Sequence, residues 1–174
     1  SSDLTLSAIP WRAVPILVAA AVACSNLLVW NEYLYKLERF GAAHVFTDAI
    51  NPLSERVTAI RAAAPKPIMV YVSDWGIWNT LAMFHRGRLP ITGIDDLFPE
   101  NPQPDRQREE ALGRVLADRD AIYLGHVASQ EVFSGIGKRI DAKLESEGLT
   151  RQTVEVVSDS NGRPMFQIFR VVPR

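Results

Sequence analysis

The residues best suited to binding a ligand lie in one short segment that follows an apolar run. Residues 73–79 are Ser-Asp-Trp-Gly-Ile-Trp-Asn, which bring together a carboxylate, two indoles and an amide. Indole faces stack on sugar rings and a carboxylate accepts hydrogen bonds from hydroxyl groups, so the candidate ligand-binding residues are Asp74, Trp75, Trp78 and Asn79. A structural alternative stays open, in which Asp74 caps the following helix and the tryptophans anchor the domain against a sheet or a membrane.

Two further candidates come from other parts of the chain. His126 follows a second apolar run, residues 121–125, and ligands in open α/β sheets bind at the carboxyl ends of strands. The alternative is that His126 is a neutral histidine whose hydrogen bonds are made inside the protein core. Arg88 belongs to Arg86-Gly87-Arg88, which suits a phosphate or a lipid headgroup, although isolated surface charges need neither.

The sequence predicts no metal site and no cofactor. The histidines His44, His85 and His126 are scattered and match no zinc-ligand spacing. Residues 135–137, Gly-Ile-Gly, lack the third glycine of a dinucleotide fingerprint, and Gly137-Lys138 is followed by Arg139 instead of Ser or Thr. The Gly-x-Ser-x-Gly nucleophile motif is also absent. These absences give no support to a metal ion, a nucleotide cofactor or a serine nucleophile in this chain.

The elements that must position these residues alternate between strand and helix. Apolar and β-branched runs predict buried strands at 67–73 and 121–125, with a short extended piece at 88–94. Helical spacing and capping signals predict helices at 75–85, 105–117 and 129–147. Asn161-Gly162 predicts a hairpin between strands 153–157 and 165–172. The fold class is therefore α/β: a small three-layer sandwich with a mostly parallel sheet and a C-terminal antiparallel hairpin.

Near the N-terminus lies a segment of a different kind. Between Arg12 and Glu32 there are 19 consecutive uncharged residues, flanked by Trp11, Trp30, Tyr33 and Tyr35. Its 18 most apolar residues would span roughly 27 Å as a helix, close to the hydrocarbon thickness of a bilayer, and aromatic side chains at both ends suit the membrane interfaces. We expect a transmembrane helix. A cleaved signal sequence and a buried helix of a soluble domain are the alternatives.

Composition narrows the classes further. The 174 residues are 47% hydrophobic and 22% charged with a net charge of −1, which argues against a disordered chain and against a strongly basic nucleic-acid binder. Charges flanking the apolar segment give no orientation, and the single cysteine, Cys24, leaves the redox compartment open. We expect four segments: a flank at 1–11, a transmembrane helix with its extension at 12–40, a connecting helix at 41–64 and the α/β domain at 65–174.

The order of these features resembles the C-terminal end of bacterial polytopic membrane glycosyltransferases, the superfamily that includes protein O-mannosyltransferases and the aminoarabinose transferases of lipid A. The likeness rests on a membrane helix, an apolar strand leading into Ser73-Asp74-Trp75-Gly76 and Asn79, and Arg86-Gly87-Arg88 further on. It implies transfer of a sugar from a polyprenyl-phosphate donor, with the α/β domain on the extracytoplasmic side of the bacterial inner membrane.

The resemblance also implies what this chain lacks. The family's catalytic acid lies in the first extracytoplasmic loop, among membrane helices that would precede these residues, so the chain alone should be inactive. Its expected partners are the lipid bilayer, those preceding helices, and a polyprenyl-phosphate sugar or a glycan acceptor; no nucleic acid is expected. A single-span anchored module that binds a sugar or a peptide is the alternative. A soluble α/β enzyme is a third class, but it needs a catalytic set that these residues do not assemble.

Overall fold

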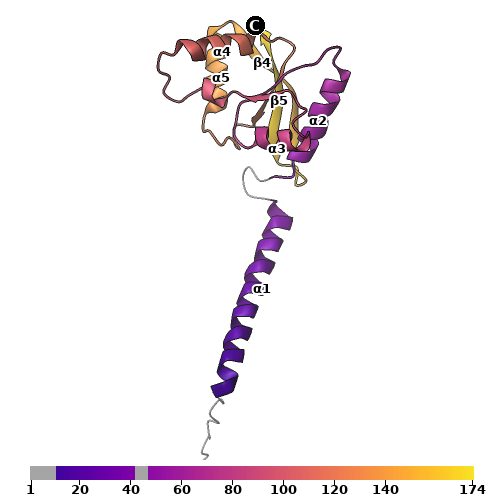
Figure 1. Ribbon diagram of the computed structural model, residues 1–174, viewed down its shortest axis with the longest axis vertical. Helices are drawn as coiled ribbons and strands as arrows, with labels where there is room; N and C mark the ends of the chain where they lie inside the picture. The colour runs from indigo at the N-terminus through magenta and orange to yellow at the C-terminus, as the bar shows by residue number, and fades with distance from the viewer. Residues whose placement is uncertain (1–10, 42–46) are drawn as a thin grey trace, which may run out of the picture. The chain divides into compact units, whose positions relative to one another are not determined.

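The computed structural model of the 174-residue chain describes residues 11–41 and 47–174, which belong to two separate units (Figure 1). In the first unit a 3-10 turn, Trp11–Ala13, leads into the helix α1, Val14–Phe40. Pro15 lies in the first turn of α1, where its missing N–H is tolerated, and the Gly41 N–H donates to the Leu37 carbonyl at the other end. Among the described residues, α1 is the one helix long and apolar enough to cross a membrane, and none of its apolar window is buried.

The second unit is built on a five-stranded mixed sheet with the strand order β2-β1-β3-β5-β4. The strands are β1 (Val70–Val72), β2 (Ile91–Gly93), β3 (Ile122–His126), β4 (Leu149–Ser158) and β5 (Pro164–Pro173). β1 pairs in parallel with β2 and β3, whereas β5 pairs antiparallel with both β3 and β4. The expected α/β class is confirmed, but the sheet is half antiparallel, because β5 inserts next to β3 and does not lie at the edge.

Helices cover both faces of this sheet. The helices are α2 (Ile50–Ala63), α3 (Ile77–Phe84), α4 (Arg106–Ala117) and α5 (Ile136–Ser146), with a 3-10 turn at Asp95–Leu97. On one face α2 and α3 pack on alternate strand residues such as Val70, Ile122 and Phe166. On the other face α4 and α5 pack on the intervening residues such as Tyr123 and Phe169. This alternation follows from the two-residue period of a strand.

Several predicted boundaries shift in the structure. The helix expected at 129–147 is wrong over its first seven residues, because α5 begins only at Ile136, after Gly135 with φ +73°. The helix expected at 75–85 begins at Ile77, after Gly76 with φ +86°. α2 begins at Ile50 within the segment expected as a connecting helix at 41–64, and its Leu53 and Val57 are fully buried in the α/β core. It therefore belongs to that core and is more than a connecting helix.

Candidate functional site

The candidate site lies where β1 and β3 run side by side and their following helices part. β1 leads into α3 on one face of the sheet, whereas β3 leads towards α5 on the other. Such a topological switch point at the carboxyl ends of parallel strands opens a crevice in which α/β proteins commonly bind ligands. Asp74 follows β1 and His126 ends β3, so the two residues predicted at this edge do meet there.

Asp74 and His126 form a buried pair at this point. The Oδ2 atom of Asp74 lies 2.9 Å from Nδ1 of His126, and the two side chains are 0% and 1% exposed. The imidazole ring also packs against the Phe166 ring, with 5.0 Å between the ring centroids. The pair therefore joins the ends of the two central strands.

The Asp74 carboxylate also gathers backbone groups from two loops. Oδ2 accepts a hydrogen bond from the Val132 N–H at 3.0 Å, and Oδ1 accepts from Trp75 at 2.8 Å and Phe133 at 3.1 Å. Burial alone would raise the pKa of Asp74, but the hydrogen bonds from His126 and these three N–H groups outweigh burial and lower the pKa below its ordinary value. Asp74 is thus a carboxylate kept ionised by donors from its own chain.

These contacts decide what the crevice can hold. Four hydrogen bonds occupy both oxygens of Asp74, and the loop after β3 folds back to supply two of them. Asp74 does not cap α3, which was the structural alternative for this residue, because the cap residue of α3 is Gly76. The switch point is therefore closed by an internal polar cross-link.

The strands also approach each other closely beside this pair. Ser73 donates a hydrogen bond from Oγ to the Leu124 carbonyl at 3.0 Å, and a Cβ atom on Gly125 would lie 2.7 Å from the same Oγ. A side chain at position 125 would thus collide with Ser73. Glycine permits this close packing of β1 against β3 where both strands end.

A small cavity of about 150 Å³ remains next to His126. Its described lining combines apolar residues with two threonines, namely Thr47, Ile50, Gly76, Ile77, Thr80, His126 and Phe166. Pockets for small molecules usually measure about 300–1,000 Å³, so this cavity is small for a sugar ring. The Thr80 hydroxyl already donates to the Gly76 carbonyl, which leaves His126 as the main polar group of the lining.

The other predicted site residues lie outside this crevice. Trp75, Trp78, Asn79 and Arg88 are all exposed, and the Trp78 indole N–H donates to the Ile91 carbonyl at 3.3 Å. The six candidates thus divide into a buried pair and an exposed group. Ligand binding by any of them stays a prediction. His44 lies outside the described residues, whereas His85 lies at the end of α3, with Nε2 3.0 Å from Ser54 Oγ.

Sequence reasoning missed the loop that closes the switch point. Glu131 in this loop accepts hydrogen bonds from the N–H groups of Gly135 and Gly137, at 2.9 Å each, and so satisfies the start of α5. The helical pattern seen over 129–147 concealed both this cap and the contacts to Asp74. An acid followed four residues later by Gly-x-Gly was the available signal, because glycines leave backbone N–H groups open to a carboxylate.

Two larger hollows lie elsewhere on the second unit. One of about 760 Å³ lies between α5 and the β4–β5 hairpin, and four of its charged lining residues form the ion pairs Arg151–Asp141 and Arg174–Glu145. The other, about 520 Å³, is a groove beside the β3–α5 loop with Asp95, Glu100 and Phe133 in its lining. Among the residues that the structure describes, no group of three or more potential metal ligands occurs.

Comparisons of the chain with protein-family models, with curated proteins and with solved structures find no match.

Proposed function

We propose that the chain is the membrane-anchored C-terminal end of a bacterial glycosyltransferase, and that its α/β domain is an accessory domain without catalytic residues of its own. In this proposal the transferase moves a sugar from a polyprenyl-phosphate donor to an extracytoplasmic acceptor. The reacting groups come from membrane helices that precede these residues. The α/β domain stabilises that membrane part or helps to position the acceptor.

The observation that carries the accessory role is the closed switch point. An α/β enzyme needs reactive side chains that face a ligand-sized opening at this edge. Here Asp74, the acid that follows β1, is fully buried and bonded to His126 and to loop N–H groups. The arrangement suits a domain whose central polar pair holds its own loops.

Two further features support the membrane transferase part of the proposal. α1 carries an apolar stretch of bilayer length with exposed side chains, and the second unit has its own two-sided core. The resemblance to the transferases rests on this order of elements: a membrane-length helix is followed by a small α/β domain that contains Ser73-Asp74-Trp75-Gly76.

The decisive experiment measures transfer of radiolabelled sugar from polyprenyl phosphate in reconstituted membranes. This chain alone should transfer none. The longer protein that ends in these residues should be active and should lose activity when residues 47–174 are removed while its membrane part stays inserted. Turnover by this chain alone would contradict the accessory role, and an initiator methionine directly before Ser1 would contradict the transferase assignment.

A matched pair of variants separates structural from chemical roles in the longer protein. Asp74→Asn should lower activity only to the extent that it lowers the folded fraction of the α/β domain. Asp96→Asn, at an exposed acid, should change neither. Complete loss of activity with a folded Asp74→Asn domain would instead assign chemistry to Asp74 and overturn the proposal.

A further inference from the structure

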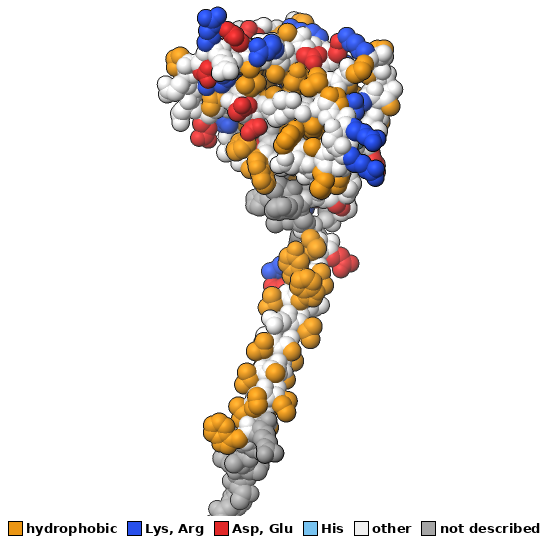
Figure 2. All heavy atoms as spheres, viewed as in Figure 1, with side chains coloured by type: hydrophobic (Ala, Val, Ile, Leu, Met, Phe, Trp, Pro, Cys, Tyr) orange, Lys and Arg blue, Asp and Glu red, His pale blue; other side chains and the backbone are white. Residues whose placement is uncertain are grey.

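One end of the α/β domain carries an unusual concentration of exposed apolar side chains. Among the described residues of the second unit, eight large apolar residues are exposed, and six of them lie on α3 or beside Asp74. These six define the aromatic patch: Trp75, Trp78, Met83, Phe84, Val132 and Phe133. In Figure 2 hydrophobic side chains gather on the part of this unit where Figure 1 draws α3.

The buried Asp74 links the backbone of three of the six patch residues. Its carboxylate binds the N–H groups of Trp75, Val132 and Phe133 within 3.1 Å, so it holds the start of α3 against the loop after β3. α3 is only eight residues long, roughly 12 Å, and carries the other three, Trp78, Met83 and Phe84. The internal cross-link thus holds the exposed residues Trp75, Val132 and Phe133 around one buried carboxylate beside the start of α3.

The charge around the patch is uneven. Arg86 and Arg88 are exposed in the turn that directly follows Phe84. On the other side, Asp95 and Glu100 line the groove that contains Val132 and Phe133. Tryptophan beside arginine is the composition of a surface that enters the headgroup region of a bilayer, where indoles partition and arginines meet lipid phosphates.

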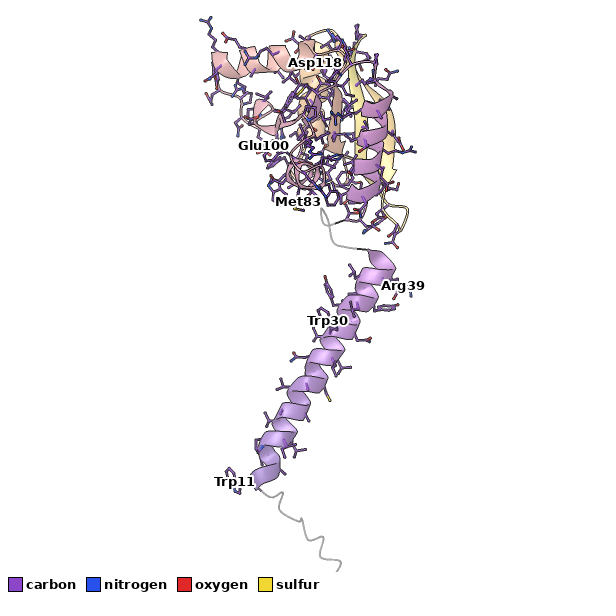
Figure 3. The ribbon with its side chains drawn as sticks, turned by 45° about the vertical axis from the view of Figure 1, so that its right-hand side comes forward. Trp11, Trp30, Arg39, Met83, Glu100 and Asp118 are labelled. Atoms are coloured by element: carbon purple, nitrogen blue, oxygen red, sulfur yellow. The ribbon has the colours of Figure 1, made fainter. Side chains whose placement is uncertain are left out.

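The first described residue of the second unit lies close to the start of α3. Thr47, the first described residue there, lines the small cavity together with Gly76, Ile77 and Thr80 of the α3 region. Met83 of α3 and Asp118 after α4 lie at opposite ends of the domain (Figure 3).

We propose that the aromatic patch docks into the lipid headgroup region of the membrane that α1 spans, with Arg86 and Arg88 on anionic lipid phosphates. This inference rests on the proposed function in one respect, the insertion of α1. Docking would fix the orientation of the α/β domain at the membrane surface.

The test uses the full chain in nanodiscs of phosphatidylcholine and phosphatidylglycerol. Trp11→Phe and Trp30→Phe leave Trp75 and Trp78 as the only indoles among the four tryptophans of the chain. In nanodiscs the fluorescence emission of these two tryptophans should lie at shorter wavelength than in detergent-free water. Brominated phosphatidylcholine should quench this emission more strongly than aqueous iodide does. Arg86→Glu with Arg88→Glu should reduce the lipid quenching, with a larger loss in discs that contain phosphatidylglycerol.

A matched control comes from the opposite part of the sheet. Val154 and Val156 on β4 are 46% and 48% exposed, close to the 45% and 51% of Trp78 and Trp75. Val154→Ser with Val156→Ser should leave lipid quenching unchanged, whereas Met83→Ser with Phe84→Ser should lower it. An equal effect of both pairs would overturn the proposal, because it would reflect general destabilisation.

The remaining quenching outcomes also test membrane docking. Quenching by iodide without quenching by brominated lipid would place the patch in water, and protection from both quenchers would mean that protein covers it; either result overturns docking. Because no sugar enters this assay, docking without transferase activity in the longer protein would overturn only the proposed function. A chain that fails to enter nanodiscs would overturn both.

Discussion

The Asp74 carboxylate lies 2.9 Å from Nδ1 of His126, at the ends of neighbouring parallel strands and across 52 residues of sequence. In the sequence alone each residue has an ordinary structural alternative, a helix cap for Asp74 and a core histidine for His126, but the cap residue of α3 is Gly76. Together with the N–H groups of Val132 and Phe133 they close the crevice of the sheet and shape its outer surface. The polar centre of this domain thus serves its architecture, and its stability should depend on that centre.

Replacement of Asp74 by asparagine should destabilise the α/β domain by about 1–3 kcal/mol, since it leaves buried N–H donors without a charged acceptor. Thermal or urea unfolding of the full chain in detergent measures this. Hydrogen exchange should show the greatest loss of protection in residues 131–135. Asp96→Asn is the matched control at an exposed position and should shift the unfolding midpoint little.

The Asp74 carboxylate should make part of the free energy of unfolding depend on pH in the acid range. Its folded-state pKa lies below that of an aspartate in an unfolded chain, about 3.9, so the unfolded state binds the proton first as pH falls. The stabilisation is therefore complete above that value and is lost as pH falls through the folded-state pKa. Unfolding midpoints of wild type and Asp74→Asn should converge as the pH is lowered through this range.

Asp159 contributes an acid-sensitive component of the same sign. Burial would raise its pKa, but hydrogen bonds from the Arg163 and Asn161 backbone and from the Arg163 side chain lower it. The difference between wild type and Asp74→Asn isolates the component due to Asp74. A difference that stays constant down to strongly acidic pH would contradict the assignment of a lowered pKa to Asp74.

The sequence predicted the edge on which Asp74 and His126 meet but not their contact. Two apolar runs locate β1 and β3, and parallel strands bring their carboxyl ends together. The loop after β3 was misassigned as helix, because helical periodicity is local whereas the acceptor of its N–H groups lies 58 residues earlier. Asn161-Gly162 likewise signals the hairpin but cannot specify that β5, and not β4, pairs with β3.

Close packing at Gly125 gives a prediction with an internal check. Gly125→Ala places a Cβ atom 2.7 Å from Ser73 Oγ and should destabilise the domain by about 1–3 kcal/mol through overpacking. Ser73→Ala removes that oxygen, so the double variant should lose less stability than the sum of the single losses. Urea unfolding of the three variants measures the coupling, and strict additivity would contradict the collision.

Gly113 in α4 provides the control with the opposite sign. A Cβ atom there would meet nothing within 4 Å, so Gly113→Ala should stabilise the domain by roughly 0.5–1 kcal/mol through helix propensity alone. Opposite signs for two glycine-to-alanine changes distinguish a steric effect at Gly125 from a general effect of removing glycine.

Membrane insertion of α1 is tested by one charge near the middle of its apolar stretch. Val22→Asp should cost about 2.5–3.5 kcal/mol of insertion free energy, whereas the same carboxylate at Asn31, beyond that stretch, should cost much less. The measurement is the fraction of full chain that floats with lipid vesicles after carbonate extraction. Wild type and Asn31→Asp should float and Val22→Asp should be depleted, because a carboxylate in hydrocarbon lacks the water that solvates it. Equal flotation of all three, or release of wild type by carbonate, would show that protein or solvent surrounds α1 instead of lipid.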